Sequence, residues 1–400
     1  MKPRSFMLIA GEASGDRLAA ELVGALRERV LRDARDLSTD LQPLRTELAP
    51  HFCGAGGPQM QAAGVDLAFD MTQHAVIGLA EVLRSILEFR RLFWRLFRFA
   101  IDRQPEVIIG VDYGGFNLRF GKAIKRYVRR HRKEFTPWNP KLVQFVSPQV
   151  WASRPGRAWT LAENYDLLLS IFPFEKDWYA RRVPGLRVEF VGHPLVGRTV
   201  ALPGAGAKPG NGTSVVLLPG SRDGEVRRHL PLVTGAFTLM RKEIPSLRGR
   251  LVLPSPALVE MARSHGLPEG LQLQSGDLTE ALARADLGIT KSGTITMECA
   301  LAGLPAVVFY RTSWPTYWVG RQLVSVPYLA MPNLLAGEAV YPEFVQHAAT
   351  PERLAGAALV LMRDAKRREL IRAKLKQVTA ALGSPGAITR AADAVVSLLN

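Results

Sequence analysis

Two hydroxyl residues flank a glycine in Ser292-Gly293-Thr294, and these residue types are suited to binding a phosphate group. The turn lies between a β-prone apolar stretch, 287–290, and a helical segment. A glycine lets an anion approach the backbone closely, and free N–H groups at a helix start attract negative charge. Glu298 lies about one helical turn further on, within reach of a sugar hydroxyl. The alternative interpretation is that Ser292 or Thr294 only caps the helix.

A second candidate group is Asp112, which directly follows an apolar strand expected at 106–111. Ligands of open α/β sheets bind at the carboxyl ends of the strands, so this carboxylate could act as a general base. Asn117 follows shortly afterwards, before a basic helix. Capping of the next turn explains Asp112 equally well from the sequence alone.

Glycine-rich turns follow the first two expected strands. The strand at 6–10 leads into Gly11-Glu12-Ala13-Ser14-Gly15-Asp16, and a strand from Phe52 leads into the turn at 54–58. The first turn lacks the G-x-G-x-x-G pattern, so a dinucleotide fingerprint is unsupported and the glycines instead make room for a substrate. Asp16 either belongs to this site or caps the helix that follows.

The elements that must position these residues alternate between strand and helix along the chain, which predicts the α/β class. A Gly/Pro/Ala-rich segment, 201–212, separates two such halves and is the expected linker. We therefore expect two doubly wound, Rossmann-like parallel-sheet domains facing a central cleft. The expected boundaries are 1–200 and 213–345, with helices in 346–400 that pack back across the domains.

Length and composition restrict the class of protein. The chain has 400 residues and is 47% hydrophobic, which excludes wholesale disorder. Cys53 and Cys299 lie far apart in apolar surroundings, which indicates reduced core thiols and not a disulfide framework. The apolar run at the start is too short for a signal peptide, and no uninterrupted apolar window is long enough to span a membrane. These features predict a cytoplasmic protein.

The net charge of +16 is concentrated in one region of the chain. Between residues 84 and 133 there are 14 Lys and Arg residues against four acidic residues, a local net charge of +10. Such a surface implies an anionic partner, which could be nucleic acid, phospholipid headgroups or a phosphorylated substrate. A merely solvated basic surface is the alternative for the run at 126–133.

The segment 77–101 has the strongest amphipathic pattern in the chain. Its apolar stripe is flanked by arginines, and additional aromatic residues lie beside the stripe, as in helices that rest on a membrane surface. An ordinary helix packed on the sheet is the alternative. The residues expected to contact lipid or acyl chains are Leu83, Phe89, Phe93, Trp94 and Phe97.

Motifs along nearly the whole chain occur in a specific order and spacing. They are 11–16, 54–58, 76–82, Asp112 with Phe116-Asn117, 147–151, 172–175, 192–195, 218–222 with Glu225, 292–294 with Glu298, and 332–337. Each motif is weak by itself. Together they resemble the lipid-A-disaccharide synthases, which are GT-B glycosyltransferases of lipid A biosynthesis.

The resemblance implies a reaction and its partners. A 2,3-diacylglucosamine unit would pass from UDP-2,3-diacylglucosamine to the 6-hydroxyl of 2,3-diacylglucosamine 1-phosphate, with inversion, giving a β-1,6-linked disaccharide 1-phosphate and UDP. The resemblance implies no cofactor and no metal. It also implies peripheral association with the anionic inner face of the cytoplasmic membrane, and no nucleic-acid partner.

The resemblance also assigns roles to residues. Asp112 would deprotonate the acceptor hydroxyl, and Arg222 would neutralise the departing UDP. The other expected UDP contacts are Ser221, Ser292, Gly293, Thr294, Glu298 and Asn333. The expected acceptor and glycine-loop residues are Gly11, Glu12, Ser14, Gly15 and Asn117.

Three positions depart from the family pattern: Gly114 replaces a usual proline, Ser153 a common aromatic residue, and Gly197 a frequent aspartate. The glycine at 114 predicts a looser loop around Asp112. Two rival functions remain at this point. One is another GT-B UDP-GlcNAc enzyme, an epimerase or a lipid-intermediate GlcNAc transferase. The other is a basic nucleic-acid-binding protein, although aromatic and arginine residues that share one amphipathic helix favour lipid.

Overall fold

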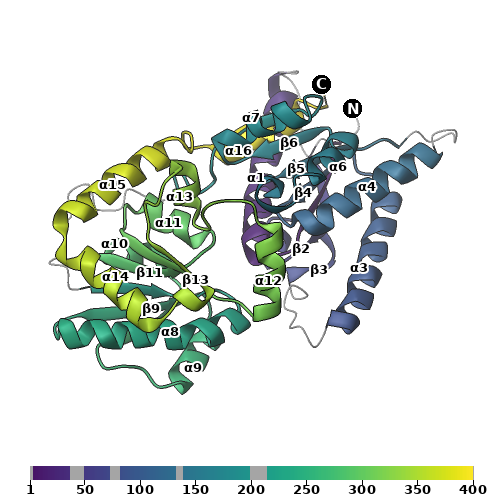
Figure 1. The fold of residues 1–400 in the computed structure, drawn as a ribbon. Helices are drawn as coiled ribbons and strands as arrows, with labels where there is room; N and C mark the ends of the chain where they lie inside the picture. The colour runs from purple at the N-terminus through teal and green to yellow at the C-terminus, as the bar shows by residue number, and fades with distance from the viewer. Residues whose placement is uncertain (1–2, 37–48, 73–81, 132–137, 199–213, 400) are drawn as a thin grey trace. The chain divides into compact units, whose positions relative to one another are not determined.

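The computed structural model describes residues 3–36, 49–72, 82–131, 138–198 and 214–399, without the side chains of 34–36 and 82–86. The expected linker at 201–212, the start of the amphipathic segment at 77–81 and the Leu83 side chain lie outside these residues. The chain divides into two compact units. Unit 1 comprises Met1–Pro194 and Leu382–Asn400, and unit 2 comprises Leu195–Ala381. Figure 1 shows strands and covering helices in each unit.

Within the described residues, unit 1 contains a sheet of seven parallel strands in the order β3-β2-β1-β4-β5-β6-β7. The strands are β1 (Ser5–Ala10), β2 (His51–Gly56), β3 (Asp66–Asp70), β4 (Val107–Val111), β5 (Lys141–Phe145), β6 (Leu167–Ser170) and β7 (Val188–Phe190). β1 pairs with both β2 and β4, so the strand order reverses between β1 and β4. This switch point is where open α/β sheets bind ligands.

Helices cover the sheet of unit 1 because its central strands are apolar toward both faces; all five residues of β4 are buried. The helices are α1 (Ala13–Asp36), α2 (Pro58–Ala62), α3 (Val82–Arg103), α4 (Gly114–His131), α5 (Val150–Ser153), α6 (Arg157–Asn164), α7 (Pro173–Arg182) and α16 (Ala387–Val396). Leu96 and Ala100 of α3 join a core with Phe120 of α4, so the expected amphipathic stripe packs partly on the core.

Unit 2 repeats the same arrangement, with a described sheet of six parallel strands in the order β10-β9-β8-β11-β12-β13. The strands are β8 (Ser214–Leu218), β9 (Arg248–Leu253), β10 (Leu271–Ser275), β11 (Leu287–Lys291), β12 (Ala306–Tyr310) and β13 (Glu343–Val345). β8 pairs with both β9 and β11, which places the switch point of this sheet between β8 and β11.

Alternating side chains along the strands of unit 2 form two apolar layers. Val215 and Leu217 of β8 pack in one layer with α8 and α14, and Val216 packs in the other with α10 and α11. The helices of this unit are α8 (Asp223–Glu243), α9 (Pro256–Ser264), α10 (Leu278–Ala283), α11 (Ile295–Leu301), α12 (Trp314–Leu323), α13 (Met331–Ala336), α14 (Pro351–Arg363) and α15 (Ala365–Ala380). In Figure 1, α8 and α14 lie side by side.

The C-terminal helices are divided between the units. α14 and α15 belong to unit 2, whereas α16 belongs to unit 1 and packs against α1. An ion pair between Arg29 and Asp393, 2.8 Å long, supports the contact of α16 with α1. Both cysteines are free thiols, as the sequence predicts. No helix in the described part of the chain is long and apolar enough to cross a bilayer.

Candidate active site

The loops after β1 and β4 meet at the switch point of unit 1. A Cβ atom on Gly11 would lie 2.5 Å from the ring of Tyr113, and one on Gly15 would lie 3.7 Å from Cβ of Asp112. Glycine at position 11 is therefore what allows the first loop to approach the loop of the expected base. Glu12 is half-buried beside this contact, and Ser14 is exposed.

The backbone around Asp112 is strained. Asp112 has a φ of 51°, Tyr113 of 42° and Val146 of 62°, all in the left-handed region that L-residues rarely adopt. The conformation is least favourable for valine, because its side chain is branched at Cβ. Each such residue costs about 1–3 kcal/mol, and such strain typically gathers at functional sites. The residues that follow β4 and β5 are therefore in strained conformations, which are not needed to form the two strands.

Two amide side chains clamp the backbone carbonyl of Asp112. Nδ2 of Asn117 donates to this oxygen over 2.9 Å, and Nε2 of Gln144 donates to it over 2.8 Å. The N–H of Asp112 donates to the carbonyl of Phe145 over 2.7 Å. Gly110 leaves space for these amides, since a Cβ there would lie 2.6 Å from Oε1 of Gln144. Asn117 is thus buried and acts on Asp112, not directly on a ligand.

Gln144 is a residue that the sequence reasoning missed. The sequence did contain an indication, because Gln144 is a polar residue within the otherwise apolar run 142–145. In the structure its side chain is fully buried. A buried amide nitrogen needs hydrogen-bond acceptors, and Nε2 of Gln144 finds them in the carbonyls of Asp112 and Val146. Those carbonyls belong to two of the three strained residues, so Gln144 stabilises both loop ends.

The surroundings of the Asp112 carboxyl favour its protonated form more than water does. Asp112 is exposed, but burial of its carboxyl among loop atoms and the negative charge of Glu12 raise its pKa above the ordinary value. A hydrogen bond with the backbone of Tyr113 opposes this shift. A higher pKa makes the carboxylate a stronger base, which is what general-base catalysis needs. These features favour the general-base interpretation over a capping role.

Asp16 does not cap the helix that follows it, which was one of its two expected roles. Its buried carboxylate accepts hydrogen bonds from the N–H groups of Gly57, Gln59 and Met60, over 2.7, 2.9 and 3.1 Å. These groups belong to the start of α2, so Asp16 caps a different helix and joins the two glycine-rich turns. Its three bonds are all internal to the protein.

The departures at Gly114 and Gly197 have physical reasons. A Cβ on Gly114 would lie 2.5 Å from Cβ of Pro148, so glycine here permits close packing of the loop. The expectation of a looser loop stays a prediction. Gly197 has a φ of 90°, which only glycine adopts without strain. Nothing in the structure explains Ser153, the last residue of α5.

A buried carboxyl supports the motifs at 147–151 and 172–175. Glu175 accepts a hydrogen bond from Nε1 of Trp151 over 3.0 Å and one from the N–H of Phe172 over 3.3 Å. Burial raises its pKa to about 7, although these hydrogen bonds lower it. Tyr179 lies nearby and shares a hydrogen bond of 3.1 Å with Ser147. These residues join the loop after β5 to α7.

The aromatic residues of α3 differ in exposure. Trp94 is 48% exposed, whereas Phe89 and Phe93 are half-buried. Phe93 packs edge-on against Phe116, with ring centroids 5.5 Å apart. Phe97 is only 9% exposed and packs in the core, but it also lines a cavity of about 400 Å³, so its expected contact with lipid or acyl chains stays a prediction. Phe89, Phe93 and Trp94 line a cavity of about 650 Å³ that also contacts Tyr113.

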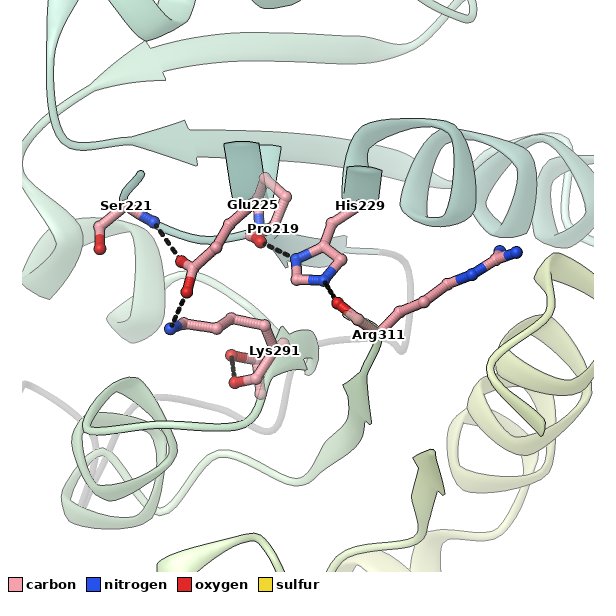
Figure 2. A network of polar contacts seen from close by, with 7 residues as sticks. Pro219, Ser221, Glu225, His229, Lys291 and Arg311 are labelled. Atoms are coloured by element: carbon pink, nitrogen blue, oxygen red, sulfur yellow. Dashed lines mark hydrogen bonds and ion pairs between the residues drawn. The ribbon is translucent and has the colours of Figure 1, made fainter. Parts of the chain in front are cut away.

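In unit 2, the loops after β8 and β11 lie at the switch point. Lys291 ends β11, and its Nζ forms an ion pair of 3.2 Å with Glu225 of α8, as Figure 2 shows. Glu225 also accepts a hydrogen bond from the N–H of Ser221 over 3.4 Å. A Cβ on Gly293 would lie 3.3 Å from Nζ of Lys291, so this glycine gives the lysine its space. Lys291 is a second residue that the sequence reasoning missed.

Glu225 and Lys291 are both partly buried, and their charges are coupled. Burial would raise the pKa of Glu225, but the charge and hydrogen bond of Lys291, the N–H of Ser221 and the charge of Arg222 together hold it below the ordinary value. Glu225 therefore stays ionised and orients Lys291. The arrangement leaves cationic groups of Lys291 and Arg222 at one switch point, where an anion would be attracted.

His229 joins the loops after β8 and β12. Its Nδ1 lies 2.6 Å from the carbonyl oxygen of Pro219, and its Nε2 lies 2.7 Å from that of Arg311 (Figure 2). A carbonyl oxygen can only accept, so both bonds form together only when both ring nitrogens carry a hydrogen. The buried ring thus joins the two loops and fixes the loop that begins at Pro219.

The residues expected to contact phosphate are not equivalent. Ser221, Arg222, Gly293 and Thr294 are exposed around the switch point. Thr294 is the residue before α11, but its side chain makes no capping hydrogen bond, so the N-cap alternative is wrong for it. The hydroxyl of Ser292 donates to the carbonyl of Leu329 over 2.8 Å, which makes it a structural group and not a free donor.

Two further expected UDP contacts lie deeper in unit 2. Asn333 is fully buried, and its amide bonds to the backbone of Tyr341 in both directions and to Oε1 of Glu343. Its direct contact with a nucleotide is therefore not supported; it joins α13 to the segment before β13. Glu298 is half-buried in the first turn of α11. That helix has only seven residues, so its dipole contributes less than a longer helix would.

Comparison with known proteins gives consistent relatives. The profile of the family described as lipid-A-disaccharide synthetase matches residues 6–395. The chain is 37% identical to the lipid-A-disaccharide synthase of Alkalilimnicola ehrlichii, over 98% of this chain and 97% of that protein. It is 36% identical to the synthase of Myxococcus xanthus, over 99% and 98%.

Solved structures show the same architecture at lower identity. The glycotransferase of kitacinnamycin matches with a TM-score of 0.61 and 17% sequence identity, over 100% of both chains. This likeness concerns the fold alone. It agrees with the expected GT-B class, in which two α/β units each contain a parallel sheet.

Proposed function

This chain belongs to the lipid-A-disaccharide synthetase family and is a glycosyltransferase, and we propose the specific reaction that it catalyses. It transfers 2,3-diacylglucosamine from UDP-2,3-diacylglucosamine to the 6-hydroxyl of 2,3-diacylglucosamine 1-phosphate. The products are a β-1,6-linked disaccharide 1-phosphate and UDP. The anomeric configuration inverts in a single displacement, so no covalent glycosyl-enzyme forms.

Unit 2 binds the UDP portion of the donor in this proposal. Negative charge grows on the diphosphate as the glycosidic bond breaks, and fixed cationic donors stabilise that charge. Arg222 is exposed, and its charge acts on the same Glu225 that forms an ion pair with Lys291. A guanidinium presents two parallel N–H groups to phosphate oxygens. Backbone N–H groups near Gly293 and the hydroxyls of Ser221 and Thr294 complete the set, and Glu298 binds the ribose.

Unit 1 binds the acceptor and removes its proton. Asp112 is the general base, and general-base catalysis typically contributes about 10²–10⁴-fold. The single observation that carries this assignment is the strained, clamped backbone of Asp112 at the switch point. Gly11 and Gly15 leave room beside Asp112, and the charge of Glu12 helps to raise the pKa of its carboxyl.

The lipid portions of both substrates explain the surface of α3. Leu87 is 68% exposed and Trp94 is 48% exposed, among several exposed arginines of the same helix. Apolar side chains rimmed by arginine bind the interface of an anionic bilayer. The enzyme would therefore associate peripherally with the inner face of the cytoplasmic membrane while it takes substrates from it.

The test is to incubate the purified protein with both acylated substrates and to detect the products by mass spectrometry. The expected result is equimolar disaccharide 1-phosphate and UDP. A parallel reaction replaces the donor with UDP-GlcNAc. Epimerisation of UDP-GlcNAc, or its faster transfer to another acceptor with no acylated disaccharide formed, would overturn the proposal.

A further inference from the structure

The cavity next to Asp112 combines aromatic walls with several cations. It has a volume of about 650 Å³ and opens between α3, the start of α4 and the segment from α5 to α6. Tyr113, Gly115 and Phe116 contribute to its wall directly after Asp112 in the chain. The other lining residues are Phe89, Arg90, Phe93, Trp94, Arg119, Arg154 and Arg157. A ligand in this cavity would therefore lie beside the expected base.

In the part of the chain that the structure describes, no acidic side chain forms an ion pair with the arginines of this cavity. Arg103 on α3, in contrast, forms an ion pair of 2.6 Å with Asp66. Within the described residues, no ion pair or side-chain hydrogen bond is formed by Arg119, Arg154 or Arg157. Unpaired cations that share a cavity repel one another and attract an anion.

The three guanidiniums are close enough to influence one another. Burial, and then the positive charges of Arg154 and Arg119, lower the pKa of Arg157. The three residues come from two separate segments, since Arg119 lies on α4 whereas Arg154 and Arg157 flank the turn between α5 and α6. The fold therefore brings like charges together, which costs free energy unless a ligand compensates for it.

We propose that Arg119, Arg154 and Arg157 bind the phosphomonoester of the acceptor sugar, an inference that rests on the proposed function. A phosphomonoester carries a charge of about −1.5 to −2 near pH 7 and offers three strong acceptor oxygens. Guanidinium groups match this geometry with paired N–H donors. The aromatic rings of the same cavity supply an apolar surface for the acyl chains. The cavity thus recognises both ends of an acylated sugar phosphate.

A second groove helps to distinguish residues that would bind the acceptor phosphate from residues that would bind membrane headgroups. It has a volume of about 400 Å³, shares Trp94 and Arg119 with the first cavity, and continues along α3 and α4. Its other cations, Lys122, Arg126 and Arg130, lie one to three helical turns further from Asp112 along α4. These outer residues suit headgroup contact, whereas Arg154 and Arg157 belong only to the first cavity.

The experiment compares Arg154→Ala, Arg157→Ala and the double variant in the transfer reaction. The acceptor is used with its 1-phosphate and, in a second arm, after enzymatic removal of that phosphate. In the wild type, loss of the phosphate should raise the acceptor KM at least tenfold. In the double variant, KM for the phosphorylated acceptor should rise at least tenfold, and the preference for the phosphorylated form should fall by a similar factor.

Controls separate the proposed contact from other effects. Arg129→Ala removes one exposed cation from α4 outside both cavities and should leave acceptor KM unchanged. Arg157→Lys retains the charge and should restore part of the phosphate preference. UDP affinity, measured by calorimetry, should be unchanged in all variants. Circular dichroism verifies that each variant is folded.

The outcomes distinguish this inference from the proposed function. If the wild type forms no acylated disaccharide, the proposed function is wrong. If the wild type forms it, but the double variant keeps its preference for the phosphorylated acceptor, only the phosphate assignment is overturned. A loss of binding to vesicles that contain phosphatidylglycerol, without a change in acceptor KM, would assign these arginines to headgroups and also overturn it.

Discussion

The two switch points of this protein shift the pKa of a carboxyl group in opposite directions. In unit 1, burial and the neighbouring Glu12 raise the pKa of Asp112. In unit 2, Lys291 and Arg222 hold the pKa of Glu225 below its ordinary value in spite of burial. The same strand order thus provides a carboxyl with a raised pKa in one unit and a carboxyl with a lowered pKa in the other.

This difference shows how one architecture serves two chemical tasks. A general base needs a raised pKa and a fixed position. In unit 1, burial and Glu12 raise the pKa of Asp112, whereas the amides of Asn117 and Gln144 hold its backbone in place. In the proposed function, binding of a diphosphate needs positive charge, which Lys291 and Arg222 would supply in unit 2. Perturbation of one unit should therefore leave the task of the other intact.

The largest expected effect is that of Asp112→Asn. The amide cannot accept the hydroxyl proton, so kcat should fall by about 10²–10⁴-fold. UDP affinity should stay within a factor of two of the wild-type value, because the substitution is confined to unit 1. Single-turnover kinetics and calorimetry measure these two quantities. Asp102→Asn, an exposed position on α3, is the matched control; a kcat for Asp112→Asn within threefold of wild type would refute the base assignment.

Arg222→Ala, a substitution in unit 2, should produce the next largest loss of kcat. Removal of one preorganised donor to a developing anion typically costs about 10²–10³-fold in kcat. Here UDP affinity should fall as well, while binding of the acylated acceptor is retained. Arg228→Ala removes an exposed arginine of α8, the helix that Arg222 directly precedes, and serves as the control. Near-normal turnover of Arg222→Ala would contradict its assignment to the leaving group.

Glu175→Gln tests the effect of burial on a carboxyl of unit 1 that is removed from the reaction. Its folded-state pKa, about 7, lies above the ordinary value of 4.5, so the folded protein holds a proton that the unfolded chain releases. Stability should therefore decrease as pH rises from 4.5 to about 7 and then stay constant. At about 1.4 kcal/mol per pH unit, the loss is roughly 3 kcal/mol.

Urea unfolding of wild type and Glu175→Gln between pH 4.5 and 8 measures this contribution. The glutamine is neutral throughout, so the difference between the two proteins should grow in favour of the variant as pH rises. Glu225→Gln is the contrasting variant, because a lowered pKa stabilises the folded state above about pH 4.5 and this stabilisation is lost as pH falls further. Parallel curves for wild type and Glu175→Gln would show that burial does not perturb this carboxyl.

Gln144→Leu should lower kcat moderately, and it tests whether the two amides that bond to the Asp112 carbonyl position the base. Asp112 keeps its carboxyl but loses one of two amide donors to its carbonyl, so kcat should fall about tenfold with little change in KM. Gln274 at the end of β10 also donates to two backbone carbonyls, which makes Gln274→Leu a matched control in unit 2. Equal effects of the two substitutions would indicate general destabilisation and not positioning of the base.

The smallest expected effect concerns the membrane. Leu87→Glu with Trp94→Glu should weaken binding to anionic vesicles severalfold and leave UDP affinity unchanged, because both side chains are exposed on α3. Val360→Glu with Leu370→Glu introduces the same charge at exposed apolar residues of unit 2. Flotation with vesicles compares the two pairs. The same loss in both would mean that net charge, and not the surface of α3, controls the association.

The sequence predicts best the features that depend on local pattern. β1, β4 and β11 each differ by one residue from the stretches predicted at 6–10, 106–111 and 287–290, because each is an apolar run bounded by turn residues. β3 was not predicted, since Asp66 and Asp70 at its ends resemble turn residues. β13, with three residues, is too short to produce a pattern.

The candidate site is predictable only in part, because a motif does not distinguish ligand contacts from internal ones. The glycine turns and Asp112 come together as expected. Asn333 and Ser292 belong to motifs as well, yet their polar groups bond within the protein. The role of Gln144 depends on strand register, which pairs it with Gly110 of β4. Such non-local pairing has no local signature in the sequence.

The most direct test of the central claim is the configuration of the new glycosidic bond. A single displacement, with Asp112 as base in unit 1 and UDP leaving from unit 2, inverts the anomeric centre of the α-linked donor. The account predicts that the one-bond and three-bond couplings of the product's linkage proton, measured by NMR, report a β linkage. An α linkage, or a glycosylated protein trapped during turnover, would contradict it.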